Sequence, residues 1–399
     1  MKKKIIPYGK HYIDNEDIKS VIKILKSDNL TQGPQIKKTE NALAKYVGSK
    51  YAVLVSSCTA GLHISCKALG VSTKTISVTS PITFVSTANA TEFCGGKNLF
   101  VDIMSDTISI DPQKLENTLK KNKRIKHVLP VHFGGLASDM KSISNICKKY
   151  KVKIIEDAAH GFGGKYLTGE RIGCCKYSDV AVFSFHPVKI LAGGEGGLVT
   201  TNSKEIYYKL LEYRSHGIIK NMNEPFSNRK EGYSNGKKNI WYYEMKELGF
   251  HYRQTDIHSA LIFSQLKKIN LFLNFRYKIS KRYDNYFKNQ KNVSLVQEKY
   301  RSFSSNHLYI IKINFNKLKI NRNEFLNKLR KSNILAQIHY IPVPFHPYYK
   351  KYSNQISGIK KAVTYYRSCL SIPIYYGLKL NEQKFVMKKI SDLINQYSK

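Results

Sequence analysis

Lys189 stands where an amine could act as a nucleophile. It follows an apolar run at residues 182–185 and precedes a glycine-rich turn at residues 193–197. Apolar surroundings lower the pKa of a lysine, and the neutral amine can attack a carbonyl carbon. Because the chain holds so many lysines, Lys189 taken alone would be more simply interpreted as a solvated surface residue.

Asp157 is a second residue that could do chemistry, since it ends the apolar run at residues 154–155. Ligands of open parallel sheets bind beyond the carboxyl ends of the strands. A buried carboxylate at that edge needs a cation, and a protonated pyridine nitrogen is such a cation. The alternative interpretation is that Asp157 only caps the next turn.

The segment SSCTAG, residues 56–61, could bind a phosphate group. It follows an apolar run at residues 51–55 and opens a helical stretch. Free backbone N–H groups at a helix N-terminus bind anions, assisted by the helix dipole. Simple capping by serine or threonine is the better explanation for this segment alone. The order of phosphate loop, sheet-edge aspartate and lysine in one chain favours the catalytic interpretation of all three.

The elements around these residues predict an α/β fold. Short apolar runs alternate with helical stretches, which is typical of a mostly parallel sheet. We expect an amphipathic helix capped by Asp14 before the sheet and a long helix over residues 255–286. The expected strands are residues 51–55, 75–78, 98–101, 127–131, 153–155, 180–185 and 197–200.

After about residue 260 the pattern changes to α+β. Strands are expected at residues 308–313 and 335–340, with helices at 323–331 and 382–397. Residues 220–240 are rich in Asn, Lys, Ser and Gly and predict an exposed loop. We therefore predict a large α/β domain over residues 1–260, including the N-terminal helix, and a small C-terminal α+β domain over residues 261–399.

Composition narrows the classes of function. With 66 Lys and Arg against 28 Asp and Glu, the formal net charge is +38, which raises nucleic acid as a partner. Because lysines recur on nearly every predicted helix, we favour general compositional drift over a nucleic-acid site. The positive field would also attract an anionic substrate such as a sugar diphosphate.

Targeting and metal signals are also missing from the sequence. No apolar stretch reaches the length of a membrane span, and the N-terminus lacks the apolar segment of a signal peptide. The seven cysteines form no C-x-x-C pair, so we expect reduced thiols, no metal and a cytoplasmic protein.

Several motifs together resemble the DegT family of pyridoxal-phosphate-dependent sugar aminotransferases. The resemblance implies an aspartate aminotransferase-like fold (fold type I), a pyridoxal 5'-phosphate cofactor and a homodimer. Among family members, the chain is most similar to those of pseudaminic acid synthesis that aminate C4 of a UDP-linked 4-keto-6-deoxy-N-acetylhexosamine with L-glutamate. The motifs are LTQGP (30–34), SPITFVST (80–87), IIEDAAH (154–160), FSFHPVK (183–189), GEGG (194–197), RSHGI (214–218) and HYIPV (339–343).

The resemblance also implies roles for individual residues. Lys189 would link covalently to the cofactor aldehyde and Asp157 would pair with the pyridine nitrogen. Phe84 would stack on the ring, although an aromatic residue in an apolar segment is commonly core. The backbone of Cys58 and Thr59 and the Ser184 hydroxyl would bind the cofactor phosphate, and His160 would lie beside the ring. His251 would reach the cofactor phosphate of the partner subunit. Arg253 and His339 would line the substrate site and the subunit boundary.

The chain departs from the family pattern at three places. His251 stands where relatives have Asn, Pro344 replaces a frequent histidine, and Ala192 with Gly193 replaces hydroxyl residues. These departures bear on the substrate more than on the cofactor, so another 3- or 4-keto sugar nucleotide stays as an alternative. A sugar dehydratase of the same fold has histidine in place of the lysine. A non-catalytic basic binding protein would be free to lose Lys189 or Asp157, and both are present.

Overall fold

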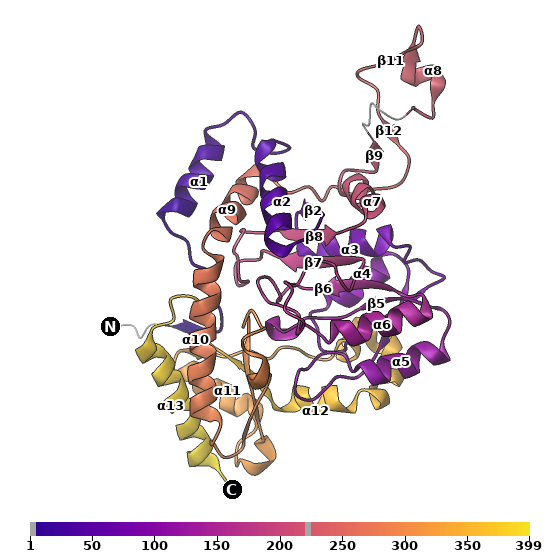
Figure 1. Ribbon diagram of the computed structural model, residues 1–399. Helices are drawn as coiled ribbons and strands as arrows, with labels where there is room; N and C mark the ends of the chain where they lie inside the picture. The colour runs from indigo at the N-terminus through magenta and orange to yellow at the C-terminus, as the bar shows by residue number, and fades with distance from the viewer. Residues whose placement is uncertain (1–4, 220–224) are drawn as a thin grey trace.

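The computed structural model describes residues 5–219 and 225–399 (Figure 1), and its centre is a sheet of seven strands in the order β2-β8-β7-β6-β5-β3-β4. Strand β8 is antiparallel to both neighbours, and the other six strands run parallel to one another. The strands are β2 (Tyr51–Val55), β3 (Ile76–Thr79), β4 (Lys97–Phe100), β5 (Ile125–Leu129), β6 (Lys153–Asp157), β7 (Val180–Ser184) and β8 (Gly197–Thr201). The predicted mostly parallel sheet is therefore confirmed, with each strand displaced by at most two residues at either end.

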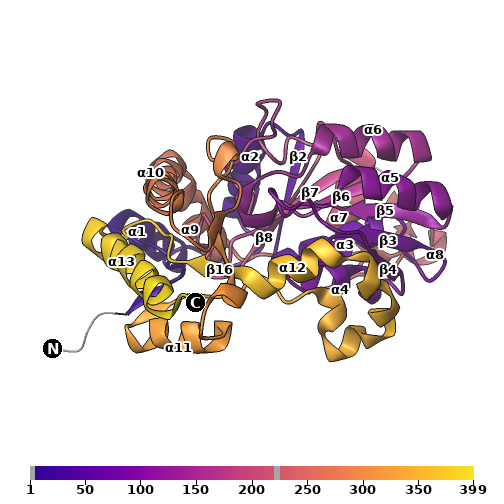
Figure 2. The same cartoon turned by 90° about the horizontal axis from the view of Figure 1, so that it is seen from below.

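Helices cover both faces of this sheet, as Figure 2 shows along the edge of the layers. Buried residues of α2 (Pro34–Val47), α5 (Pro112–Lys121) and α6 (Met140–Tyr150) form one core with the sheet. Helices α3 (Cys58–Ala68) and α7 (Lys204–Arg214) contribute to a second core on the opposite face, and α4 (Ser86–Phe93) lies beside α3. The sheet thus forms the middle layer of three, with a layer of helices on each face.

Side-chain caps determine where several of these helices begin. The Ser57 hydroxyl accepts the N–H of Ala60 at the start of α3. Asp111 and Asp139 cap α5 and α6 in the same way, which satisfies amides that the first turn leaves without partners. Ser57 follows β2 after a single residue, whereas Asp111 and Asp139 stand at the ends of longer connections from β4 and β5.

The C-terminal third packs around a third core, formed mainly by α10 (Ile269–Phe287), α13 (Leu380–Tyr397) and a three-stranded antiparallel sheet. Ile6 joins this core, because β1 (Ile6–Pro7) pairs in parallel with β15 (Ile334–Leu335). The sheet consists of β13 (Val293–Leu295), β14 (Tyr309–Ile313) and β16 (Cys369–Ile372), accompanied by helices α11 (Arg322–Lys331) and α12 (Lys360–Ser368). The division into domains at residue 260 remains a prediction.

Two expected elements differ from the structure. The long helix predicted over residues 255–286 is divided into α9 (Asp256–Leu266) and α10, with Lys267 and Lys268 between them. The strand predicted at residues 335–340 is confined to β15 and a single bridge at Gln337. Residues beyond that bridge leave the sheet, and His339 and Tyr340 instead line a cavity.

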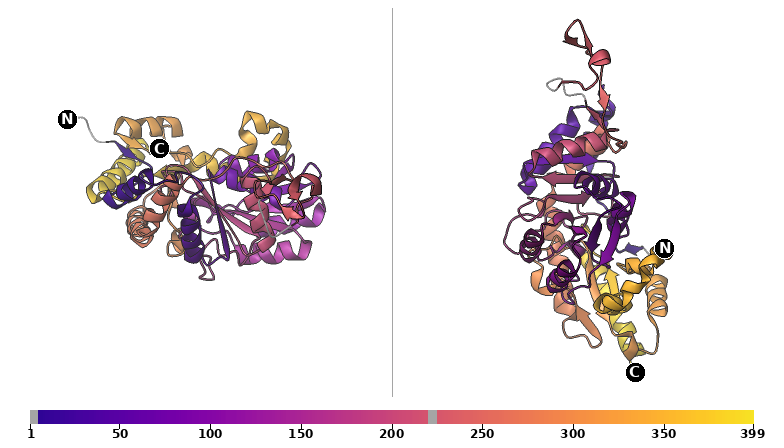
Figure 3. Two further views of the ribbon diagram at one scale, coloured as in Figure 1. Left: turned by 90° about the horizontal axis from the view of Figure 1, so that it is seen from above. Right: turned by 90° about the vertical axis from the view of Figure 1, so that its right-hand side faces the viewer.

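A long arm projects from the top of the molecule, away from these cores (Figures 1 and 3). It contains β9 (Ile218–Ile219), α8 (Arg229–Gly232), β10 (Tyr233–Ser234), β11 (Lys237–Lys238) and β12 (Glu244–Met245). The predicted loop over residues 220–240 thus contains a small hairpin, and its residues 220–224 lie outside the described part. Helix α1 (Asn15–Leu25), capped by Asp14 as expected, packs on α9. Within residues 5–219 and 225–399 no helix has the length and apolarity needed to cross a membrane.

Candidate active site

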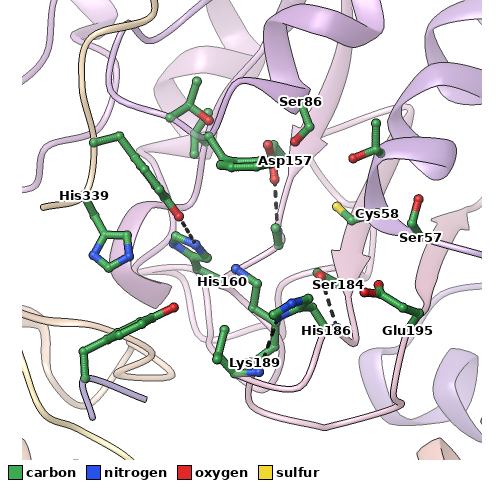
Figure 4. Close-up of a pocket in the computed structure, with 18 residues that line it drawn as sticks. Ser57, Cys58, Ser86, Asp157, His160, Ser184, His186, Lys189, Glu195 and His339 are labelled. Atoms are coloured by element: carbon green, nitrogen blue, oxygen red, sulfur yellow. Dashed lines mark hydrogen bonds between the residues drawn. The ribbon is translucent and has the colours of Figure 1, made fainter. Parts of the chain in front are cut away.

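A cavity of about 370 Å³ lies at the carboxyl ends of β6 and β7, where Figure 4 shows side chains from separate segments pointing inward. Eight of the ten predicted site residues line it, namely Cys58, Thr59, Phe84, Asp157, His160, Ser184, Lys189 and His339. Parallel strands place their following loops at one sheet edge, so residues far apart in the sequence meet there. The roles of these residues remain predictions, but their convergence on one cavity is a structural fact.

Lys189 carries an amine with an unusual ionisation in this cavity. Burial lowers the pKa of Lys189 to about 8, while Cys58 and Asp157 oppose that shift. Its backbone is held in a turn, since the Lys189 N–H donates to the His186 carbonyl oxygen at 2.8 Å. At pH 7 roughly a tenth of such an amine is neutral, against roughly 0.03% for an ordinary lysine. Lys189 is therefore suited to act as a nucleophile or a base.

Asp157 presents a carboxylate at the end of β6. The Thr87 hydroxyl donates to one oxygen at 2.5 Å and the Ala159 N–H donates to the other at 3.1 Å. The side chain is buried, yet no described lysine, arginine or histidine forms an ion pair with it. A buried carboxylate with two neutral donors can still bind a cationic N–H in the cavity.

The neighbouring residue Glu156 holds the end of β6 in place from the opposite face. Its buried carboxylate accepts hydrogen bonds from His132 Nε2 at 2.5 Å, from the Tyr166 hydroxyl at 2.8 Å and from the Ser178 hydroxyl. Successive side chains of a strand point to opposite faces, so this network fixes the strand without entering the cavity. Asp157 consequently has a well-defined position.

The N-terminus of α3 borders the cavity. The N–H groups of Cys58 and Thr59 belong to the first turn and have no acceptor within the helix. Strand β8 approaches this turn closely, because a Cβ added at Gly197 would lie 2.5 Å from the Ser57 carbonyl oxygen. Ser184 ends the adjacent strand and also lines the cavity. The glycine-rich motif thus leaves room for the loop whose amides can bind an anion.

Three histidines beside the cavity are buried, and two of them, His160 and His339, line it. Burial and nearby Lys189 lower the pKa of His160 well below its ordinary value, and they lower the pKa of His339 to about 3. His339 Nδ1 is 2.9 Å from the Ser371 hydroxyl. His307, whose pKa burial also lowers, packs against His160 with ring centroids 4.5 Å apart. This side of the cavity carries no positive charge from histidine near neutral pH.

Phe84 lines the cavity with a largely exposed aromatic ring. It is 57% exposed and its ring centroid lies 6.1 Å from that of Tyr340. A core phenylalanine would be covered by neighbours, so this exposure is what stacking on a planar ligand requires. The geometry supports the predicted stacking role over the alternative that Phe84 is core.

His251 and Arg253 are the two predicted site residues that do not line the cavity. His251 is exposed, forms a backbone bridge with Ser215 and stacks on His216 with centroids 5.3 Å apart. Arg253 is half-buried and bridges to Val55. Both were expected at a subunit boundary, which a single chain does not contain, so their roles stay predictions.

Several residues that line the cavity are not among the predicted site residues. Tyr8 comes from the N-terminal segment, Tyr340 from the C-terminal third, and His186 and Glu195 flank the predicted lysine. The motifs FSFHPVK, GEGG and HYIPV contain His186, Glu195 and Tyr340. The motifs therefore indicate that these three residues lie near the site, although their residue types alone do not. Tyr8 has no such signal, because long-range contacts bring it to the site: β1 pairs with β15, and the Ile374 N–H donates to the Tyr8 carbonyl oxygen at 3.0 Å.

The combination fits pyridoxal phosphate. A poised amine, a buried carboxylate, an aromatic face and a helix N-terminus correspond to the aldehyde, ring nitrogen, ring and phosphate of that cofactor. Within the described residues no group of three His, Cys, Asp or Glu side chains could hold a metal ion.

Known proteins are similar in sequence to this chain over nearly its whole length. The model of the DegT/DnrJ/EryC1/StrS aminotransferase family matches residues 11–391. The UDP-4-amino-4,6-dideoxy-N-acetyl-beta-L-altrosamine transaminase of Campylobacter jejuni subsp. jejuni serotype O:23/36 is 36% identical over 396 residues, which cover 99% of both chains.

Solved structures share the fold. PseC of Helicobacter pylori, an aminotransferase involved in the biosynthesis of pseudoaminic acid, superposes with a TM-score of 0.88 at 29% identity, covering 99% of this chain and 100% of that one. The putative sugar aminotransferase Spr1654 of Streptococcus pneumoniae, in its PLP form, has a TM-score of 0.87 at 24% identity, with 98% and 99% covered.

Proposed function

Because the chain belongs to the DegT/DnrJ/EryC1/StrS aminotransferase family, we propose that it moves the amino group of L-glutamate to the C4 ketone of a UDP-linked 4-keto-6-deoxy-N-acetylhexosamine. It is a pyridoxal-phosphate-dependent aminotransferase with the predicted fold type I architecture. The assignment of this sugar rests mainly on one observation, the full-length similarity to the altrosamine transaminase of Campylobacter.

The residues that line the cavity have separate roles in such a reaction. Pyridoxal phosphate, when bound, supplies an electron sink for the carbon that loses its proton. Lys189 Nζ takes that proton from Cα of glutamate, for which its lowered pKa provides the neutral amine. Asp157 holds the ring nitrogen, and the amides of Cys58 and Thr59 with the Ser184 hydroxyl orient the phosphate.

A cytoplasmic location is part of the same proposal. All seven cysteines are free thiols, which supports a reducing compartment. The substrates are anionic, and the net charge of +38 favours their approach without requiring a nucleic-acid partner.

The substrate can be tested with a panel of keto-sugar nucleotides. We expect the purified enzyme with glutamate to convert the UDP-linked 4-keto-6-deoxy-N-acetyl sugar at least about 100-fold faster than a dTDP-linked 3-keto sugar, because binding contacts determine kcat/KM. Mass spectrometry and NMR of the product identify the amino sugar and the aminated carbon. Exclusive activity on the dTDP-linked 3-keto sugar, or on amino acids alone, would contradict the proposed acceptor.

We also propose a homodimer, supported by two exposed apolar surfaces. On the arm, Ile240 is 91% and Trp241 66% exposed, and on α1 the residues Ile18, Ile22 and Leu25 share an open face. Both surfaces lie toward the upper end of the molecule in Figure 1. A second copy related by a two-fold axis can bury an arm and a helix face from each chain.

Sedimentation measures this association directly. We expect a mass of about twice the 45.8 kDa chain for the wild type. Trp241→Ser should weaken the dimer at least about tenfold, since a buried tryptophan contributes a large apolar area. The control Phe385→Ser removes an exposed aromatic from α13 at the other end of the molecule and should leave the dimer intact. A monomeric wild type would exclude the proposed dimer.

A further inference from the structure

The ring of His160 has a fixed hydrogen-bond direction. The Gly134 N–H donates to His160 Nδ1 at 3.3 Å, so this nitrogen accepts and cannot carry a proton. Burial and the nearby Lys189 and His339 keep the pKa of His160 well below its ordinary value, so the ring is neutral. A neutral imidazole has one proton, which must then be on Nε2.

That proton decides how the hydroxyl of Tyr340 is used. His160 Nε2 is 3.2 Å from Tyr340 Oη, the contact drawn as the dashed line ending at His160 in Figure 4. Since Nε2 is the donor, the phenol oxygen is the acceptor. The phenol proton is therefore not used in this hydrogen bond and can be donated elsewhere. Burial raises the pKa of Tyr340, so the phenol keeps this proton.

The Tyr340 proton has no acceptor in the described protein. Its hydrogen bond to His160 is the one recorded for this hydroxyl within residues 5–219 and 225–399. The ring is held firmly, stacked on His160 with an interplanar angle of 28° and edge-on to Phe133. Because Tyr340 lines the cavity, an enclosed O–H donor faces the space that a ligand would fill.

The chemistry of this donor points to a neutral oxygen. Carboxylates and phosphates are recognised best by cations, above all by the fork of arginine, and no arginine lines the cavity in the described residues. A neutral phenol instead matches a ketone or hydroxyl oxygen, which needs one directional hydrogen bond and no charge.

We propose that Tyr340 is a specificity-determining residue whose hydroxyl donates to an oxygen of the keto sugar, while His160 holds that hydroxyl in the donor orientation. The inference rests on the proposed function, because it assigns the donor to the sugar and not to glutamate. Tyr340 takes part in no covalent step; it binds the sugar through a hydrogen bond and retains its proton.

Tyr340→Phe tests the assignment, since it removes the hydroxyl and keeps the ring contacts. We expect kcat/KM for the keto sugar to fall about 30-fold, because the sugar oxygen and the His160 N–H both lose a partner. The glutamate half-reaction, followed by the cofactor absorbance, should change less than about threefold. The matched control Tyr283→Phe removes a buried hydroxyl that donates to the Pro373 carbonyl oxygen in the core of the C-terminal third and should alter neither rate. Equal losses in both half-reactions would overturn the proposal.

The hydrogen-bond direction has a readout that is independent of turnover. In protein labelled with ¹⁵N-histidine, the His160 signals, assigned with His160→Gln, should show the proton on Nε2. A proton on Nδ1 would overturn the inference. A wild-type enzyme that completes the glutamate half-reaction and aminates none of the sugars would overturn the proposed function instead, and the two failures are therefore distinguishable.

Discussion

Replacing Lys189 by alanine is expected to abolish amino transfer, with a loss of about 10⁴-fold or more. The cavity presents no second amine, since Lys189 is the one lysine that lines it within the described residues. The neighbouring histidines cannot replace it as nucleophiles toward an aldehyde, and their depressed pKa values make them weak bases. Single-turnover rates with glutamate measure the effect.

The matched control for this substitution is Lys267→Ala, which removes an exposed lysine from the break between α9 and α10. It should retain the wild-type rate. Circular dichroism should be unchanged in both variants, because neither side chain packs in a core. Near-normal transamination by Lys189→Ala would show that the lysine is misassigned.

The strands could be predicted from the sequence because burial on both faces leaves a direct signature. Strands β2 and β7 are apolar along nearly their whole length, and turn residues or charges bound them. The sequence predicts one helix over residues 255–286, because apolar periodicity gives no sign of a break at Lys267 and Lys268. Breaks of this kind depend on what each half packs against.

The site could be predicted as far as each residue follows a recognisable local pattern. Lys189, Asp157 and the α3 N-terminus are each adjacent to a strand end, so the topology alone gathers them. Tyr8 and Tyr340 reach the cavity through the pairing of the N-terminal segment with the C-terminal third. Contacts between segments hundreds of residues apart are not encoded in the local pattern of either segment.

Asp157→Asn is expected to leave the fold intact while the rate of glutamate deamination falls about 10²- to 10³-fold. An asparagine fits the same space, and its carbonyl oxygen can still accept the Ala159 N–H. Its amide N–H₂ can donate to the Thr87 hydroxyl, which in turn has the Thr83 hydroxyl 2.7 Å away as a partner. The buried side chain therefore keeps its hydrogen bonds and loses only its negative charge.

That charge matters because the ring nitrogen of pyridoxal phosphate withdraws electrons most strongly when it carries a proton, and a buried carboxylate beside it favours the protonated form. Rapid-mixing absorbance with glutamate measures the deamination rate, and a pyridoxal phosphate titration measures affinity. The control Asp139→Asn replaces the cap of α6 by another good cap and should alter neither quantity. If Asp157→Asn deaminated glutamate at the wild-type rate, the carboxylate would have no part in the chemistry and Asp157 would be only a turn cap.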